Sequence, residues 1–333
     1  MAPEWDSHIE SIVVGVPEGL SLQCWLTVVK LTVVKLTVVR KLLVAFAALP
    51  AILAAAAPGG TGPAGADTGV QQPEGSAPIP DVPALAWIVA DLDSGQVLAG
   101  RDQNVAHPPA STIKVLLALV VLDELSLDST VVVNAADTDI GCSCVGVRVG
   151  RTYSARQLLD GLLLVSGNDA ANTLAHMLGG QQVAVAKMNA KASSLGAMNT
   201  RASSPSGLGV GDPRDPGATT AHDLAVIFRA AMANPVFAEI TAEQSAMFPG
   251  DGGERKIVNV DEMLQRYPGT IGGKTGYTPL AHTTFVGAAS RDDRRLVVAM
   301  LYDDESGQRY WEQAAHLLDW GFALHPESAI GTL

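Results

Sequence analysis

A serine and a lysine stand three residues apart in the stretch HPPASTIKVLLALVVLDEL, residues 107–125. Residues at i and i+3 share one face of a helix, so Ser111 and Lys114 can touch. A serine beside a basic group is the pairing of a nucleophile with its general base. A capping serine and a solvated lysine would show the same spacing. However, the unbroken apolar run after Lys114 predicts an interior helix, which favours the chemical interpretation.

Burial would change the chemistry of Lys114. A lysine desolvated near a helix N-terminus loses its preference for the ammonium form. To act as a base near neutral pH, its pKa must fall by ~3 units, roughly 4 kcal/mol against the charged state. Neutral Lys114 could then take the proton of Ser111, whose backbone N–H would face a developing oxyanion.

Two further motifs carry groups suited to the same reaction. Ser166-Gly167-Asn168 falls between two expected helices, and Lys274-Thr275-Gly276 falls on an expected strand. The first is also typical of a turn with a helix cap, and the second of a strand in which a glycine permits close backbone approach. As chemistry, Ser166 would pass a proton to a leaving amine and Asn168 would hold the substrate backbone. Lys274 and Thr275 would bind a carboxylate.

The elements that must position these residues follow a clear order along the chain. Residues 86–100 alternate around an Asp-Ser-Gly turn, which predicts a β-hairpin. Apolar spacing predicts helices over residues 154–165, 169–178, 183–195, 219–233 and 310–324. Residues 269–278 and 282–304 are typical of strands. Strands at both ends and helices between them predict an α+β fold with one antiparallel sheet and an inserted helical lobe.

Composition excludes several classes of function. The 333 residues carry a net charge of −12, which argues against nucleic-acid binding. The chain has no metal-type pairing of cysteine and histidine, so the sequence predicts neither a metal site nor a cofactor. Cys142 and Cys144 can form a strained Cys-x-Cys disulfide in an oxidising compartment or remain free thiols.

The N-terminal part is typical of an exported protein. Residues 1–57 form a leader whose residues 39–57 fit a signal peptide, with basic Arg40 and Lys41, an apolar run and small residues at its end. A retained N-terminal anchor is the alternative. Residues 58–82, rich in Gly, Pro and Ala, predict a linker before a catalytic domain over residues 83–326. We therefore expect a protein exported across the cytoplasmic membrane, either secreted or associated with the cell wall.

The three motifs together resemble the superfamily of penicillin-binding proteins and serine β-lactamases. The stretches HPPASTIKVL, LLLVSGNDAAN, PSGL and GGKTGYT are most similar to the D-alanyl-D-alanine carboxypeptidases of family S11, the secreted mycobacterial members above all. The resemblance spans about residues 80–325. It implies a β-lactamase/transpeptidase-like fold with a five-stranded antiparallel sheet flanked by helices.

The same resemblance implies an activity and a set of site residues. The expected reaction is removal of the terminal D-alanine from peptidoglycan stem peptides through an acyl-enzyme, with acylation by β-lactam antibiotics and a role in cell-wall remodelling. The implied catalytic residues are the nucleophile Ser111, its base Lys114, the proton relay Ser166 and the substrate-orienting Asn168. The implied substrate-binding residues are Lys274, Thr275, Gly276 and Tyr277, with the N–H groups of Ser111 and Tyr277 as the oxyanion hole.

Two other functions fit part of the pattern. A class A β-lactamase uses a glutamate after the second motif to activate the deacylating water. From Ala170 to Gly211 the chain has no Asp or Glu, and its second motif is Ser-Gly-Asn rather than Ser-Asp-Asn. A non-catalytic sensor of β-lactams or muropeptides would suit a leader and linker, but such a module does not require three intact motifs.

Overall fold

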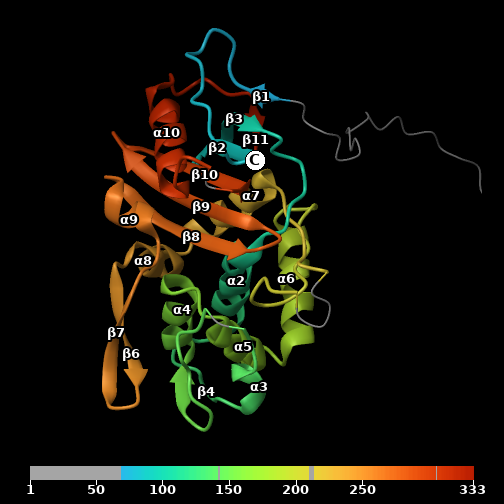
Figure 1. Ribbon diagram of the computed structural model, residues 1–333, viewed down its shortest axis with the longest axis vertical. Coiled ribbons are helices and arrows are strands. Elements are labelled where there is room, and N and C mark those ends of the chain that lie inside the picture. Colours follow the sequence, from blue (N-terminus) through green and yellow to red (C-terminus); the bar gives the residue numbers. More distant parts are fainter. Residues whose placement is uncertain (1–68, 142, 210–213, 305) are drawn as a thin grey trace, which may run out of the picture. The chain divides into compact units, whose positions relative to one another are not determined.

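The computed structural model describes residues 69–141, 143–209, 214–304 and 306–333 (Figure 1). Its helices are η1 Ala110–Ile113, α2 Lys114–Glu124, α3 Ala135–Thr138, α4 Ala155–Leu164, α5 Asn168–Met177, α6 Gln181–Ser194, α7 Ala221–Met232, α8 Pro235–Ala242, α9 Glu262–Arg266 and α10 Tyr310–Ala323. Its strands are β1 Val70–Gln71, β2 Ala86–Asp91, β3 Gln96–Arg101, β4 Thr130–Val132, β5 Thr152–Ser154, β6 Ser245–Gly250, β7 Gly253–Val258, β8 Thr270–Thr278, β9 His282–Arg291, β10 Arg294–Asp303 and β11 Gly331–Thr332.

The main sheet joins the two ends of the described chain, as the order of elements predicts. Its strands run β1-β3-β2-β10-β9-β8, with β11 also paired to β3, and all pairings are antiparallel. The expectation of five strands needs a correction. Five long strands are present, and β1 and β11 add two more at the β3 edge. A two-residue strand carries no alternation of apolar and polar residues, so the sequence pattern could not reveal either one.

Each face of the sheet buries its own core. The alternation along β10 sends Val297, Ala299 and Leu301 to one face and Leu296, Val298 and Met300 to the other. The second face packs on α10 through a cluster that includes Trp87 and Leu317. The first face packs on the helices of the inserted lobe. Figure 1 shows α10 and α7 on either side of the strands.

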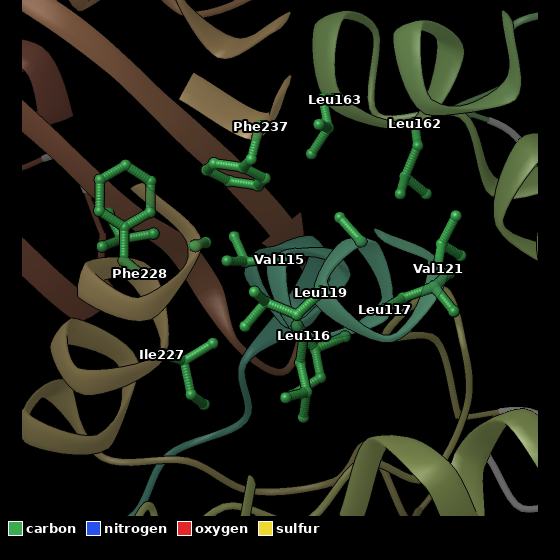
Figure 2. Close-up of a cluster of buried hydrophobic side chains, with 14 of the residues drawn as sticks. Val115, Leu116, Leu117, Leu119, Val121, Leu162, Leu163, Ile227, Phe228 and Phe237 are labelled. Atoms are coloured by element: carbon green, nitrogen blue, oxygen red, sulfur yellow. The ribbon is translucent and has the colours of Figure 1, made fainter. Parts of the chain in front are cut away.

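Helix α2 is the centre of the larger core. Its residues from Lys114 to Val121 are all buried, because the helix is apolar around its whole circumference. Figure 2 shows side chains from α4, α7 and α8 surrounding it, among them Leu162, Phe228 and Phe237. A helix held on all sides gives its first residue, Lys114, a fixed and dry position.

Several smaller elements of the lobe were not predicted from the sequence. They are the short hairpin β4–β5, helix α3, the longer hairpin β6–β7 and the short helices α8 and α9. Helix α4, which was predicted, begins with a capping box of Ser154 and Gln157. The Ser-Gly-Asn motif follows the end of α4, and α5 begins at its last residue, Asn168.

The expected leader, residues 1–57, lies outside the described residues. Within the expected linker, β1 pairs with β3, and Trp320 donates a hydrogen bond to the carbonyl of Ala77. The segment from Val70 on therefore packs against the catalytic body. In the part of the chain that the structure describes, no single helix is long and apolar enough to span a membrane; only α7 and α8 taken together, across a sharp bend, pass that test.

Candidate active site

The 3-10 turn η1 carries Ser111 into the floor of the site. Ala110, the residue before Ser111 and the first of η1, adopts a left-handed backbone conformation with φ of 48°. This conformation is uncommon for a residue with a Cβ and stores strain. The carbonyl of Pro109 accepts hydrogen bonds from the hydroxyls of Thr112 at 2.6 Å and Thr284 at 2.9 Å. These bonds fasten η1 to strand β9 and hold the serine in place.

Lys114 has its side chain directed at the expected catalytic groups. Its Nζ lies 2.7 Å from Ser111 Oγ, 2.6 Å from Asn168 Oδ1 and 3.3 Å from Ser166 Oγ. The side chain is fully buried. Burial holds the pKa of Lys114 well below its ordinary value, and the positive charge of Lys274 acts in the same direction. The burial of Lys114 thus acts in the direction that the sequence argument required of a general base.

The Ser-Gly-Asn motif lies across from η1. Ser166 has a positive φ of 58°, which turns its hydroxyl toward both lysines. Asn168 accepts a hydrogen bond from Lys114 through Oδ1 and donates one through Nδ2 to the carbonyl of Gly141 at 2.6 Å. The amide is therefore oriented by partners at both ends, and its remaining hydrogen-bonding capacity is available to a ligand.

Asp169, which the sequence analysis did not single out, fixes the loop beside this motif. Its buried carboxylate accepts hydrogen bonds from the backbone N–H groups of Val145 at 2.8 Å, Gly146 at 2.6 Å and Val147 at 2.9 Å. The loop in turn provides Ser143 to the cleft. A turn motif alone gives no signal for such a carboxylate, because its partners are backbone groups of a distant segment.

Lys274 reaches the same serine from strand β8. Its Nζ donates hydrogen bonds to Ser166 Oγ at 2.9 Å and to the carbonyl of Thr275 at 2.6 Å. Its side chain is 1% exposed, and burial lowers its pKa to about 7. Thr275, rather than Lys274, lines the cleft. Lys274 therefore contacts Ser166, the expected proton relay, in addition to its expected role in binding a carboxylate.

Gly276 allows β8 to lie directly against η1. A Cβ at this position would stand 2.8 Å from the backbone nitrogen of Ser111 and 2.5 Å from Thr284 Oγ1. Only glycine leaves the space for this approach. The next residue, Tyr277, is 66% exposed and borders the cleft. The backbone of β8 and the nitrogen of Ser111 are thereby neighbours, as an oxyanion hole shared between Ser111 and Tyr277 requires.

A cleft of about 520 Å³ opens over these groups. Its size suits a short peptide or a small molecule. The lining residues come from η1, the loop between α3 and β5, the end of α4, the Ser-Gly-Asn motif, the segment between β7 and α9, β8, β9 and α10: Ser111, Ser143, Val165, Ser166, Val260, Thr275, Gly276, Tyr277, Thr283 and Tyr310. Tyr310 and Val260 were not predicted, because neither lies in a motif or in a recognisable pattern.

The structure brings all eight sequence-predicted site residues together. The polar contacts above join the four expected catalytic residues with Lys274, and Thr275, Gly276 and Tyr277 line the cleft. Of the open alternatives for the cysteines, Cys144 is in a disulfide, while Cys24 and Cys142 lie outside the described residues.

A buried base beside a serine, a second hydroxyl between two lysines and a peptide-sized cleft define an enzyme of serine acyl transfer. Residues 71–305 match the model of the peptidase S11 family, described as D-alanyl-D-alanine carboxypeptidase. The chain belongs to this family of serine peptidases, as the sequence motifs predict.

Similar proteins agree with this assignment. The chain is 73% identical over 264 residues to the D-alanyl-D-alanine carboxypeptidase DacB2 of Mycobacterium tuberculosis, covering 79% of this chain and 90% of that protein. A crystal structure of a D-alanyl-D-alanine carboxypeptidase from the same organism superposes with a TM-score of 0.77 at 72% identity, covering 79% of this chain and all of that one.

A more distant structure shows the same fold. The DD-transpeptidase of a Streptomyces strain superposes with a TM-score of 0.68 at 29% identity, covering 74% of this chain and all of that one. The predicted β-lactamase/transpeptidase-like α+β fold is confirmed. Family membership does not favour the β-lactamase or the sensor alternative.

Proposed function

We propose that the protein removes the terminal D-alanine from peptidoglycan stem peptides that end in D-Ala-D-Ala, by way of an acyl-enzyme on Ser111. The contact of 2.7 Å between Ser111 Oγ and the Nζ of the buried Lys114 carries this proposal. Ser111 is at the same time part of the lining of an open cleft. A nucleophile that contacts a buried base on one side and faces a solvent-accessible cleft on the other is arranged for acylation by a bound substrate.

In the acylation step, neutral Lys114 accepts the proton of Ser111 as Oγ attacks the carbonyl carbon between the two D-alanines. The N–H groups of Ser111 and Tyr277 stabilise the oxyanion. Ser166, 3.3 Å from Lys114 Nζ, passes the proton to the amine of the departing D-alanine. Water then hydrolyses the ester, which regenerates Ser111 and releases a peptide one residue shorter.

Substrate binding uses the other predicted residues. Asn168 orients the substrate amide, while Lys274 and Thr275 attract the terminal carboxylate along the edge of β8, where Gly276 and Tyr277 complete the wall. A β-lactam carries a reactive amide and a carboxylate in a similar arrangement, so the same attack opens its ring and leaves a penicilloyl-type ester on Ser111. The scheme requires only side chains, backbone N–H groups and water, and no cofactor.

The place of action proposed for the enzyme is outside the cytoplasmic membrane. The signal-like residues 39–57 and the location of peptidoglycan support export, with a secreted or wall-associated mature protein and a retained anchor as the alternative. N-terminal sequencing of the protein recovered from culture medium and from cell walls tests this. A mature chain that still contains residues 39–57 would contradict cleavage of the signal and indicate the retained anchor.

The experiment that tests the activity is incubation of the purified protein with a pentapeptide ending in D-Ala-D-Ala, followed by measurement of released D-alanine. We expect multiple turnovers and loss of turnover after labelling with a penicillin. Labelling without turnover would indicate a sensor. Rapid, repeated hydrolysis of the penicillin would indicate a β-lactamase.

A further inference from the structure

The backbone that carries Ser111 is strained at the residue just before it. Ala110 holds a left-handed conformation with φ of 48°, which a residue with a Cβ leaves unless its surroundings prevent it. The hydrogen bonds from Thr112 and Thr284 fix the carbonyl of Pro109, one residue earlier. The group packed against Ala110 itself therefore decides whether Ser111 keeps its place.

A loop from a distant part of the chain lies against Ala110. It consists of residues 204–208, Ser-Pro-Ser-Gly-Leu, which we call the serine loop. A Cβ on Gly207 would stand 2.0 Å from the Ala110 carbonyl oxygen and 2.5 Å from the carbonyl carbon, so the backbone of Gly207 abuts that peptide group. Gly207 has a φ of 84°, which glycine adopts without strain. The carbonyl oxygen of the preceding residue, Ser206, lies 3.5 Å from Ser111 Oγ.

The hydroxyl of Ser204 closes the serine loop. It accepts a hydrogen bond from the N–H of Gly207 at 3.0 Å and donates one to the carbonyl of Leu208. Ser206 Oγ accepts a longer hydrogen bond, at 3.3 Å, from the N–H of Leu208. Ser204 and Ser206 are both buried, so water cannot readily replace either hydroxyl. Buried backbone groups left without partners are costly, and the two hydroxyls therefore stabilise the conformation that places Gly207 against η1.

The segment that carries the serine loop is held at its base by other contacts. Arg201 and Ala218 form an isolated β-bridge, with N–H to carbonyl distances of 2.8 and 2.9 Å. His107 and Thr219 form a second bridge of the same kind, also at 2.8 and 2.9 Å. Neither bridge involves a serine of the loop. Loss of a hydroxyl in the serine loop should therefore change its local conformation rather than detach the segment from the body.

We propose that Ser204 is a positioning residue whose hydroxyl keeps Gly207 against the Ala110 carbonyl and so holds the nucleophile beside its base. The proposal rests on the proposed function, in which Ser111 is acylated. With the hydroxyl removed, Gly207 can withdraw and Ala110 can relax toward an ordinary backbone conformation. Ser111 Oγ would then leave its contact of 2.7 Å with Lys114 Nζ. A displacement approaching 1 Å at a reacting group costs up to ~10²-fold in rate.

A graded set of serine-to-alanine variants of the full chain tests the proposal. Ser204→Ala removes both hydrogen bonds of the hydroxyl that closes the loop, and Ser206→Ala removes the longer single one. Ser203→Ala is the matched control, because the Ser203 hydroxyl is buried and has no hydrogen-bond partner among the described residues. Ile227→Val controls for stability, since it removes a buried methyl group from the core of α7.

The assay follows acylation by a penicillin in a stopped-flow instrument. It separates the dissociation constant of the initial complex from the first-order rate constant of acylation. Labelling by a fluorophosphonate, which needs no recognition of a carboxylate, measures the reactivity of Ser111 independently. A thermal melt records the stability of each variant. A merely structural role of Ser204 would lower Tm and leave both rates unchanged at temperatures well below the melt.

We expect the rate constant of acylation to fall by at least ~10-fold in Ser204→Ala and by less in Ser206→Ala, with the dissociation constant unchanged. Ser203→Ala and Ile227→Val should be acylated at the parental rate, although the second should melt at a lower temperature. A rate constant in Ser204→Ala within about twofold of the parent, an equal fall in Ser203→Ala, or an equal fall in Ile227→Val would each overturn the proposal.

Two further outcomes are distinguishable from these. If Ser204→Ala does not fold, the comparison of Ser206→Ala with Ser203→Ala decides, and equal acylation rate constants in those two variants would overturn the proposal. A parent protein that reacts with the fluorophosphonate but releases no D-alanine from the pentapeptide would refute the proposed function. The same order of labelling rates among the serine variants would then still support the positioning role of Ser204.

Discussion

Replacing Gly276 by alanine tests whether the reactive geometry depends on the contact between β8 and η1. The added Cβ would stand 2.8 Å from the nitrogen of Ser111 and 3.0 Å from that of Thr112, both of them backbone atoms. It would also stand 2.5 Å from Thr284 Oγ1, which is already committed to the Pro109 carbonyl. No flexible side-chain end is available to give way.

The size of the effect follows from these distances. Restoring ordinary van der Waals separation requires η1 and β8 to part by about 0.6 Å. Overpacking of this kind costs about 1–3 kcal/mol of stability, which lowers Tm by a few degrees for a domain of this size. A displacement approaching 1 Å at a reacting group costs up to ~10²-fold in rate. We therefore expect acylation of Ser111 to slow by roughly 10- to 100-fold.

The assay is the second-order rate of labelling by a fluorescent penicillin, read together with a thermal melt. Gly252→Ala is the control, because a Cβ at Gly252 meets nothing within 4 Å and its backbone is not left-handed. It should label at the parental rate. If Gly276→Ala is folded and labels within threefold of the parent, the argument from strand contact is wrong.

Four more outcomes follow from the site. Ser111→Ala should abolish penicillin labelling while the protein stays folded; full labelling would identify another nucleophile. Lys114→Ala should slow labelling by at least ~10²-fold, whereas Lys187→Ala, at a surface ion pair with Glu124, should label normally; a loss below tenfold in Lys114→Ala would mean that another group is the base. Lys274→Ala should slow turnover of both a D-Ala-D-Ala peptide and a matched ester without the carboxylate, because Ser166 loses a donor; an unaffected ester would restrict Lys274 to carboxylate recognition. The pKa of Lys274 is about 7 in the folded protein and 10.5 in an unfolded chain, so the unfolded chain binds more protons between these pH values. The free energy of unfolding should therefore rise with pH in this range. Urea denaturation of the parent and of Lys274→Met at several pH values measures this, and an equal dependence of the free energy of unfolding on pH in the two proteins would contradict it.

The sequence was sufficient to predict those contacts of the site that join residues close together along the chain. Ser111 and Lys114 meet because they are one helical turn apart, and this geometry needs no knowledge of the fold. The meeting of Ser111 with Ser166 and Lys274 was predicted from the resemblance, since no periodicity specifies which face of which strand will oppose η1. The long strands and main helices followed from alternation and apolar spacing.

The residues that the sequence did not reveal act through contacts that no sequence motif specifies. Asp169 lies at a helix start and binds backbone groups, and many acidic residues at such positions do nothing further. Tyr310 enters the cleft only because α10 packs across the sheet. The hairpin β6–β7 was missed because only Phe248 and Ile257 are buried in it, so its strands show no alternation of burial.

The role of Lys274 shows how burial changes a conclusion drawn from a motif. From the sequence, a lysine on a strand is a cation that faces a substrate carboxylate. In the fold Lys274 is 1% exposed, and its ammonium group donates a hydrogen bond to Ser166, the proposed proton relay. A buried cation near Ser166 favours the transfer of a proton to the leaving amine, and it also attracts a carboxylate from across the strand edge. The two duties are therefore properties of one charge.

The destabilising features of the fold are concentrated at the site. Ala110 and Ser166 both hold a left-handed backbone conformation, at a cost of about 1–3 kcal/mol each. Lys114 and Lys274 are both buried against their preference for the charged state. All four lie within the contact network of Ser111, whereas the cores on either side of the sheet are packed with apolar side chains. The apolar helix α2 and the two-sided sheet must therefore hold the strained groups in place, because those groups would relax apart without them. The same cores that give the fold its stability are thus what keeps Ser111 reactive.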